Sequence, residues 1–88
     1  MTERSKPYLA WIRRLPCLCC LGPSEPHHCN PKGHGGEALK ASDYRCIPLC
    51  RKHHTEAHSL GKETFARRYG IDYETVIAEL NRIYRERR

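Results

Sequence analysis

The stretch that decides the fold runs from residue 48 to residue 58 and reads PLCRKHHTEAH. We expect a short helix from Cys50 to Leu60, closed by a glycine directly after it. Each helical residue turns the chain by about 100°, so His54 and His58 project from one side of this helix. By the same geometry His53 and His58 point roughly 140° apart. The adjacent His53 and His54 can therefore serve two separate sites on two sides of one helix.

The first of these sites is predicted to be a structural zinc centre. Cys50 and His53 form a C-x2-H pair, and the upstream run CLCC contains a second pair, Cys17 and Cys20. Two tight local pairs brought together by the fold are the usual construction of a tetrahedral zinc site. Thiolate ligands favour zinc over magnesium. Such a site would supply folding energy that the small core of an 88-residue chain lacks.

Other cysteines compete for this first site. Cys19 is an alternative to Cys20, and Cys29 or Cys46 could replace another of the ligands. The N-terminal residues have no apolar run of the signal-peptide kind, and no stretch is long enough to span a membrane. We therefore expect a cytoplasmic protein without membrane contact, whose six cysteines are thiols or ligands rather than disulfides.

The second site is predicted from the histidines left over. We expect a strand from Pro26 to Cys29 and a second strand over 43–49. Neighbouring side chains on a strand point to opposite faces, so one of His27 and His28 can bind a metal while the other stays free. Together with His54 and His58, this gives an imidazole site with open coordination positions. Open positions are typical of a catalytic metal, and the free histidine can act as a general base.

These motifs resemble one family when they are taken together. The chain contains LPCxxC at 15–20, PHH at 26–28, GHGG at 33–36, KASD at 40–43 and PLCRKHH at 48–54. This combination resembles the HNH, or ββα-metal, endonucleases, and it is most similar to the small phage and prophage proteins related to the phage recombination-enhancement nuclease. The two histidine motifs also resemble the nuclease domains of DNase-type colicins.

The resemblance implies a role for each motif residue. His28 would be the general base, and His27, His54 and His58 would hold a catalytic Mg²⁺, Mn²⁺, Ni²⁺ or Zn²⁺. Cys17, Cys20, Cys50 and His53 would hold the structural zinc. Neither Asn30 nor Asn81 takes the place of the family's asparagine, so Asp43 is the candidate that orients the base, and Arg45 stands at the spacing where many members have asparagine. His34, in the glycine-rich loop, is a candidate for phosphate or metal contact or an exposed loop residue.

The implied fold is a small α+β domain, with a ββα-metal (His-Me finger) core, a zinc knuckle and C-terminal helices. We expect residues 1–88 to form one domain: an N-terminal helix or turn over 7–16, the knuckle and core over 17–60, and helices over 62–88. The last helix should be capped by Asp72. Its apolar stripe should face the core, and the stripe consists of Tyr73, Val76, Ile77, Leu80 and Tyr84.

The charge of the chain suits a polyanionic partner. The formal net charge is +6, and basic residues gather within residues 1–16 and 81–88. We therefore expect DNA as the partner, with Lys32, Lys40 and the terminal arginines contacting phosphates without reading sequence. The resemblance adds a recombinase filament as a partner and a bacterial or phage-infected cell as the setting. The alternatives are a non-catalytic zinc module that binds nucleic acid and an accessory protein of phage recombination.

Overall fold

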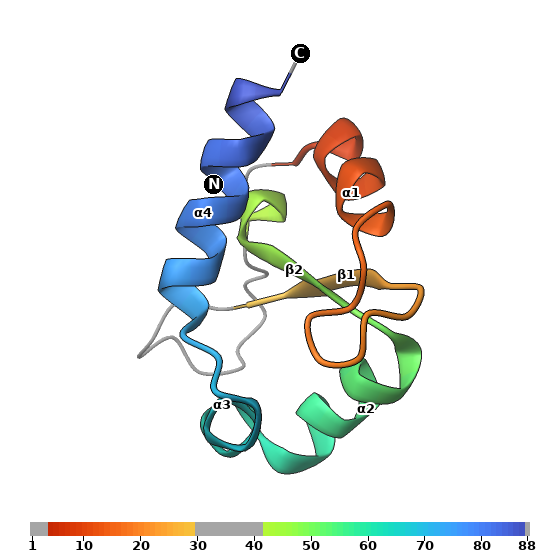
Figure 1. Ribbon diagram of the computed structural model, residues 1–88, viewed down its shortest axis with the longest axis vertical. Helices are drawn as coiled ribbons and strands as arrows, with labels where there is room; N and C mark the ends of the chain where they lie inside the picture. The colour runs from red at the N-terminus through yellow and green to blue at the C-terminus, as the bar shows by residue number, and fades with distance from the viewer. Residues whose placement is uncertain (1–3, 30–41, 88) are drawn as a thin grey trace.

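The computed structural model describes residues 4–29 and 42–87. Over these residues the chain is a small, compact α+β structure with a two-stranded sheet and four α-helices. In chain order the elements are α1 (Lys6–Arg13), β1 (Glu25–His28), the 3₁₀ helix η1 (Asp43–Arg45), β2 (Cys46–Leu49), α2 (Arg51–Leu60), α3 (Lys62–Tyr69) and α4 (Tyr73–Glu86). The sheet lies between α1 and α4 on one side and α2 and α3 on the other (Figure 1).

The two strands pair in an antiparallel register that places the histidine pair opposite a buried strand. His27 lies opposite Ile47 and His28 opposite Cys46. All four residues of β2 are buried. His27 is buried and His28 is exposed, as strand alternation requires. Because the sheet has two strands within residues 4–29 and 42–87, both are edge strands there, and the prolines that face each other across it are tolerated.

The second strand is shorter than the predicted span of 43–49. Only Cys46–Leu49 is extended, and residues 43–45 form the 3₁₀ helix η1 instead. The Ser42 hydroxyl accepts a hydrogen bond from the Tyr44 backbone N–H, and the Ser42 carbonyl accepts one from the Arg45 N–H. These local bonds cap a helical turn and compete with strand pairing. The turn directs the Asp43 side chain inward, where it is buried.

The helices begin and end close to where their capping residues indicate. The Asp72 carboxylate accepts from the Thr75 N–H at the start of α4, as expected. Gly70 adopts the left-handed conformation, with φ of 66°, that closes α3. Cys50 caps α2 through its sulfur, which accepts from the His53 N–H. The N-terminal helix ends at Arg13, earlier than the predicted span of 7–16, and a turn continues from it.

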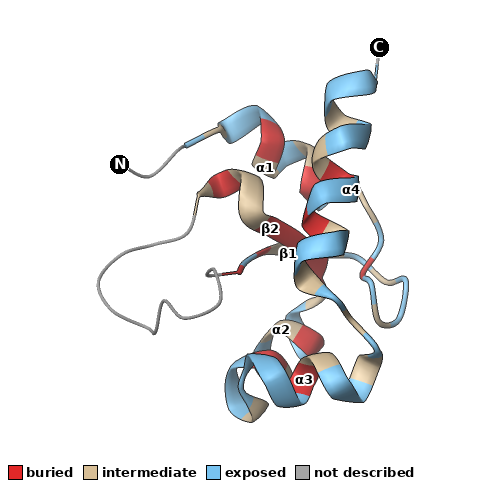
Figure 2. Cartoon of the chain, turned by 90° about the vertical axis from the view of Figure 1, so that its left-hand side faces the viewer, coloured by how far each residue is buried: buried red, intermediate tan, exposed pale blue. Residues whose placement is uncertain are grey.

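The core forms where α1, β2 and α4 meet. Tyr8 and Ile12 of α1 are fully buried against β2, and Ile77 and Leu80 of α4 are buried on the same side, as the stripe predicted. Figure 2 shows these buried segments on the facing sides of the elements, with exposed residues on their outer sides. No helix in the described part of the chain is long and apolar enough to cross a bilayer.

Candidate functional site

The structure brings together the four residues predicted for the first metal site. Cys17 and Cys20 come from the turn after α1, and Cys50 and His53 come from the first turn of α2. Cys20 Sγ lies 3.8 Å from Cys50 Sγ, and Cys17 Sγ lies 3.7 Å from His53 Nδ1. Cys50 Sγ lies 3.1 Å from His53 Nδ1. All four ligand atoms lie within 4.8 Å of one another.

These separations fit a metal ion held at the centre of the group. Bonds of about 2.3 Å from zinc to sulfur and about 2.0 Å to nitrogen give tetrahedral edges of roughly 3.5–3.8 Å. The distances from Cys20 to Cys50 and from Cys17 to His53 match those edges, while the distance from Cys50 to His53 is shorter. The Cys19 backbone N–H donates to Cys17 Sγ at 3.3 Å. The cluster of three cysteines and one histidine could therefore hold a metal ion.

The backbone of the knuckle is shaped to present its two sulfurs. The Leu21 N–H donates to the Cys17 carbonyl, and the Cys17 N–H donates to the Gly22 carbonyl. Leu21 adopts a positive φ of 66°, which is unusual for a residue with a side chain. The Leu18 N–H donates to the Pro48 carbonyl at 3.0 Å, and this bond docks the knuckle against the end of β2.

The other cysteines lie outside this cluster. Cys29 and Cys46 belong to the hydrophobic core, and burial raises the pKa of each thiol to about 12. Burial also raises the pKa of Cys19 to about 12. Burial alone would raise the pKa of Cys17 too, but backbone hydrogen bonds outweigh that effect and lower it to about 6. This lowering favours the thiolate form of Cys17, which is the form that binds metal. All six cysteines are free of disulfides.

The second cluster contains three histidines from two elements. His27 comes from β1, and His54 and His58 come from successive turns of α2. Their ring centroids are 4.5 Å apart for His27 and His54, 5.3 Å for His27 and His58, and 5.0 Å for His54 and His58. One ring nitrogen of each lies within 4.8 Å of the others. The adjacent His53 and His54 therefore do face two different clusters.

Two observations suggest that this cluster is suited to a ligand. The Nδ1 atoms of His27 and His54 are buried and have no hydrogen-bond partner among the described residues. Buried polar atoms without a partner are costly. Burial, together with the neighbouring His54 and His58, lowers the pKa of His27 to about 4. His27 is thus neutral at physiological pH, and a neutral imidazole is the form that binds a metal ion.

Glu25 lies beside the cluster and was not found from the sequence. Its Oε2 lies 2.7 Å from His54 Nδ1, although the ring is not aligned as a hydrogen-bond donor to it. The Arg51 guanidinium lies 3.3 Å from the other oxygen. Burial alone would raise the pKa of Glu25, but the hydrogen bond from Arg51 and the nearby His54 ring lower it. The missed signal was the strand period, because residues 25 and 27 share one strand face.

His28 projects from the other face of β1 and is held by Asp43. Its Nε2 lies 2.9 Å from Asp43 Oδ1. Asp43 Oδ2 accepts from the Ser5 N–H at 2.7 Å, and Arg4 lies 3.5 Å from Oδ1. Burial would raise the pKa of Asp43, but the bonds from His28 and Ser5 outweigh it and lower the pKa. The carboxylate is therefore charged and accepts a hydrogen bond from Nε2–H, and in that tautomer of the neutral ring Nδ1 of His28 carries no proton.

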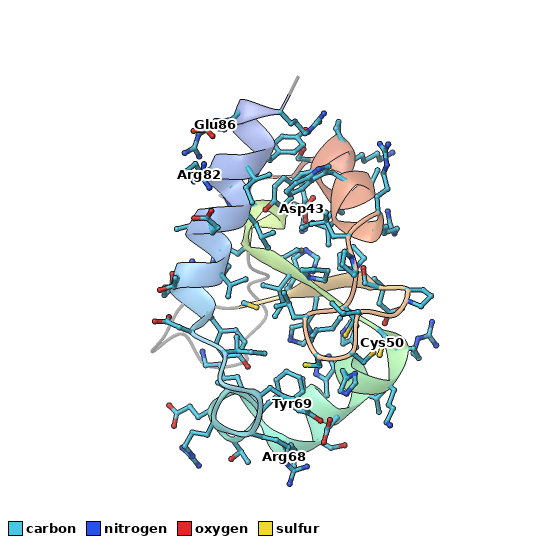
Figure 3. The ribbon with its side chains drawn as sticks, in the orientation of Figure 1. Asp43, Cys50, Arg68, Tyr69, Arg82 and Glu86 are labelled. Atoms are coloured by element: carbon cyan, nitrogen blue, oxygen red, sulfur yellow. The ribbon has the colours of Figure 1, made fainter. Side chains whose placement is uncertain are left out.

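A hollow of about 230 Å³ opens beside the histidines. It is lined by His27 and His28 from β1, by His58 from α2, and by Lys62 and Tyr73 among others. The hollow therefore touches both the candidate base and the candidate metal ligands. Figure 3 shows Asp43 beside α1 and Cys50 at the start of α2, so Asp43 and the cysteine cluster lie at different places in the fold.

The remaining candidates fall elsewhere. Arg45 has other hydrogen-bond partners than His28, because its guanidinium pairs with the Glu74 carboxylate through two hydrogen bonds and its Nε donates to the Cys29 carbonyl. Asn81 bonds the Tyr44 carbonyl from α4. The candidates outside the described residues are Asn30, Lys32, His34, Lys40 and Arg88.

Comparison with known proteins adds a family. Residues 1–85 match the model of the family described as "Protein of unknown function (DUF968)". Over 76 residues the chain is 40% identical to "Uncharacterized protein YdfU" of Escherichia coli (strain K12). That alignment covers 85% of this chain and 22% of the relative, so the chain spans about a fifth of that protein's length. No solved structure matches the chain. The chain therefore belongs to the DUF968 family.

Proposed function

We propose that this chain is a metal-dependent DNA endonuclease domain of the HNH type, which hydrolyses phosphodiester bonds with His28 as its general base. The observation that carries the proposal is the arrangement around β1. His28 is oriented by a charged, buried Asp43, while His27 on the opposite strand face joins His54 and His58. A purely structural metal site would have no need of an oriented histidine beside it.

The order of the elements supports a ββα-metal core. Two antiparallel strands are followed at once by α2, and the histidine cluster draws one side chain from the first strand and two from the helix. The cluster offers only imidazole nitrogens as ligands, and His58 is exposed. We propose that it holds a catalytic Mg²⁺, Mn²⁺, Ni²⁺ or Zn²⁺ with open positions, while the Cys17 cluster holds a structural Zn²⁺ as a closed tetrahedron.

The proposed reaction starts from a water molecule in the hollow beside His28. Nδ1 of His28 takes a proton from this water as its oxygen attacks phosphorus, and the bond from phosphorus to the 3′ oxygen breaks, with that oxygen taking a proton from solvent. Asp43 keeps the proton of the ring on Nε2 and stabilises the imidazolium that forms. A divalent ion at the histidine cluster, when bound, supplies positive charge to a phosphate oxygen and to the leaving oxygen. General-base assistance contributes about 10²–10⁴ in rate.

DNA is the substrate that the charge distribution favours. The net charge of +6 suits a polyanion, and backbone contacts of this kind carry little sequence information. We propose that the domain acts in a bacterial or phage-infected cell, in the cytoplasm, where DNA engaged by a recombinase filament is a further substrate. Weak sequence preference is the expected behaviour.

The test is a plasmid-nicking assay in the presence of each of Mg²⁺, Mn²⁺, Ni²⁺, Co²⁺ and Zn²⁺, paired with metal analysis. The wild type should bind one zinc tightly and nick supercoiled DNA when a second ion is supplied. His54→Ala should keep the first zinc, lose the second metal and lose nicking. If His54→Ala nicks as fast as the wild type, the histidine cluster does not hold the catalytic metal.

A further inference from the structure

A second hollow lies between η1 and α4, away from the metal clusters. It has a volume of about 350 Å³ and is lined by Tyr44, Asn81, Tyr84 and Arg85. Residues 81, 84 and 85 follow helical i, i+3, i+4 spacing, so they share one face of α4. This combination of two aromatic rings, an amide and a guanidinium is not used by the proposed reaction. The volume falls within the range of small-molecule sites.

Other aromatic side chains pack against the two tyrosine rings that line this hollow. Tyr8 is fully buried, and its ring centroid lies 4.9 Å from those of Tyr44 and Tyr84. Trp11 lies 5.3 Å from Tyr84. Tyr44 and Tyr84 are themselves only half-buried, so each retains accessible surface. A preformed aromatic platform loses little conformational entropy when a flat ligand stacks on it.

The polar groups of the hollow suit a nucleobase and its phosphate. Asn81 Nδ2 is occupied by the Tyr8 hydroxyl and by the Tyr44 and Ile77 carbonyls. Within the described residues no hydrogen bond reaches Asn81 Oδ1, which can therefore accept one from a ligand N–H. Arg85 is exposed at the rim.

Arg85 is the cation among the residues that line the hollow, and the other arginines of this end of α4 have partners of their own. Arg82 is paired with Glu79 and Glu86. Figure 3 shows Arg82 and Glu86 on the side of α4 that points away from α1. Arg87 lies over the Tyr84 ring, with its guanidinium carbon 4.3 Å from the ring centroid. Aromatic faces combined with arginines are the features by which proteins bind single-stranded nucleic acid.

The hollow and the candidate base are related through two consecutive residues. Tyr44 directly follows Asp43, and Asp43 holds His28 at 2.9 Å. A strand whose phosphate lies at His28 can therefore reach the hollow within a few nucleotides, because each nucleotide advances about 3.4 Å along a duplex axis and more when extended.

We propose that this hollow, lined by Tyr44, Asn81, Tyr84 and Arg85, receives one unpaired base of a DNA strand whose backbone passes His28. The inference rests on the proposed function, since it assigns a place to the substrate of that site. The base packs against the part of the Tyr84 ring that lines the hollow and donates a hydrogen bond to Asn81 Oδ1, and Arg85 contacts the adjacent phosphate. The domain thus prefers DNA with unpaired bases to continuous duplex.

The test compares two oligomers that differ only in their bases. One is an oligothymidylate of about ten nucleotides, within the site sizes of single-strand binding folds, and the other is its abasic counterpart of equal length and charge. Binding is measured by fluorescence anisotropy in the His28→Ala background, so that no cutting occurs. The oligothymidylate should bind more tightly by roughly 5- to 150-fold, the range that stacking of one base supplies.

Variants assign that difference to the hollow. Tyr84→Leu keeps the apolar packing and should lose the preference for oligothymidylate, whereas Tyr84→Phe should retain it. Arg85→Ala should weaken binding of both oligomers. Arg67→Ala, which removes an exposed arginine of α3, is the matched control and should weaken binding less.

A second measurement does not depend on how the variants fold. In heteronuclear NMR spectra of the unsubstituted chain, oligothymidylate should shift the Asn81 side-chain amide and the Tyr44 and Tyr84 resonances, and the abasic oligomer should not. Equal affinity for the two oligomers, or shifts confined to other residues, would overturn the base site. If the protein nicks DNA but binds both oligomers equally, only this inference fails. If it prefers oligothymidylate through Tyr84 but never nicks, only the nuclease proposal fails.

Discussion

Asp43→Asn is the substitution that separates orientation of the base from packing. The side chain keeps its size, but one of its two oxygens becomes an NH₂ group. Oδ2 accepts from the backbone N–H of Ser5, which cannot rotate away. An amide nitrogen at that position would put two donors against each other, so the amide oxygen must face Ser5. The NH₂ group then faces His28.

The consequence for His28 is a change of tautomer. Its Nε2 must accept from the new NH₂ group instead of donating to a carboxylate, so the ring proton moves to Nδ1. Nδ1 can then no longer take a proton from water. We expect the nicking rate to fall by about 10²–10⁴, the size of a general-base contribution and of the loss caused by an equivalent tautomer change in the serine-protease triad.

The cost to stability is smaller than the cost to activity. The Ser5 bond changes from charge-assisted to neutral, and the Arg4 contact, at 3.5 Å from an exposed guanidinium, contributes little. Together these changes should lower the free energy of unfolding by about 1–2 kcal/mol. Each kcal/mol shifts the melting temperature of a domain of this size by about 4–8 °C. The variant should therefore remain folded at the temperature of a nicking assay.

The assay measures plasmid nicking and thermal unfolding in parallel for Asp43→Asn, Asp43→Ala and Asp72→Asn. Asp72 caps α4 by accepting from the Thr75 N–H, and asparagine is an equally good cap, so Asp72→Asn should match the wild type in both measurements. Wild-type nicking by Asp43→Asn, at a rate equal to that of Asp72→Asn, would refute the orienting role of Asp43.

Three further predictions concern the metal site, pH and charge. Cys17→Ser should lose the tightly bound zinc and much of its thermal stability, whereas Cys19→Ser in the same knuckle should keep both, as measured by metal analysis and melting. The pKa of His27 is about 4 in the folded protein and about 6.5 in the unfolded chain, so protonation favours unfolding between these values. The zinc-loaded protein without a second ion should therefore be fully stabilised above pH ~6.5 and lose stability as the pH falls towards ~4. Denaturant titrations should show this loss in the wild type, and an equal loss in His27→Gln would contradict it. Replacing Arg85 and Arg87 by glutamine should weaken DNA binding and reduce the slope of log affinity against log salt by up to about 0.9 for each phosphate that the arginines neutralise; an unchanged slope would place these arginines away from DNA.

The elements that follow local rules could be predicted from the sequence. The spacing of His54 and His58 on one helix, the Asp72 cap and the stripe through Ile77 and Leu80 depend on helical periodicity, and the structure agrees with each. The pairing of Cys17 and Cys20 with Cys50 and His53 also follows from short spacings. Spacing alone does not show which of the six cysteines are ligands, because burial of Cys29 and Cys46 depends on how α1 and α4 cover the sheet.

What could not be predicted depends on contacts between distant segments. The 3₁₀ turn over 43–45 arises from the Ser42 cap, whose strength relative to strand pairing a sequence pattern does not reveal. The hydrogen bond that fixes the Asp43 carboxylate comes from the backbone N–H of Ser5, which is 38 residues away. Arg45 turned out to pair with Glu74, 29 residues further along the chain. Each of these contacts requires the packed fold before it can be recognised.

The central claim is that His28 is the base of a nuclease, and His28→Ala tests it most directly. The variant should retain its fold, its zinc, its second metal and its affinity for DNA, because His28 belongs to neither metal cluster. Its nicking rate, measured with the most effective divalent ion, should fall by about 10² or more. A wild type that is inert with every ion would favour a binding module instead, and nicking that persists unchanged in His28→Ala would contradict the assignment of the base.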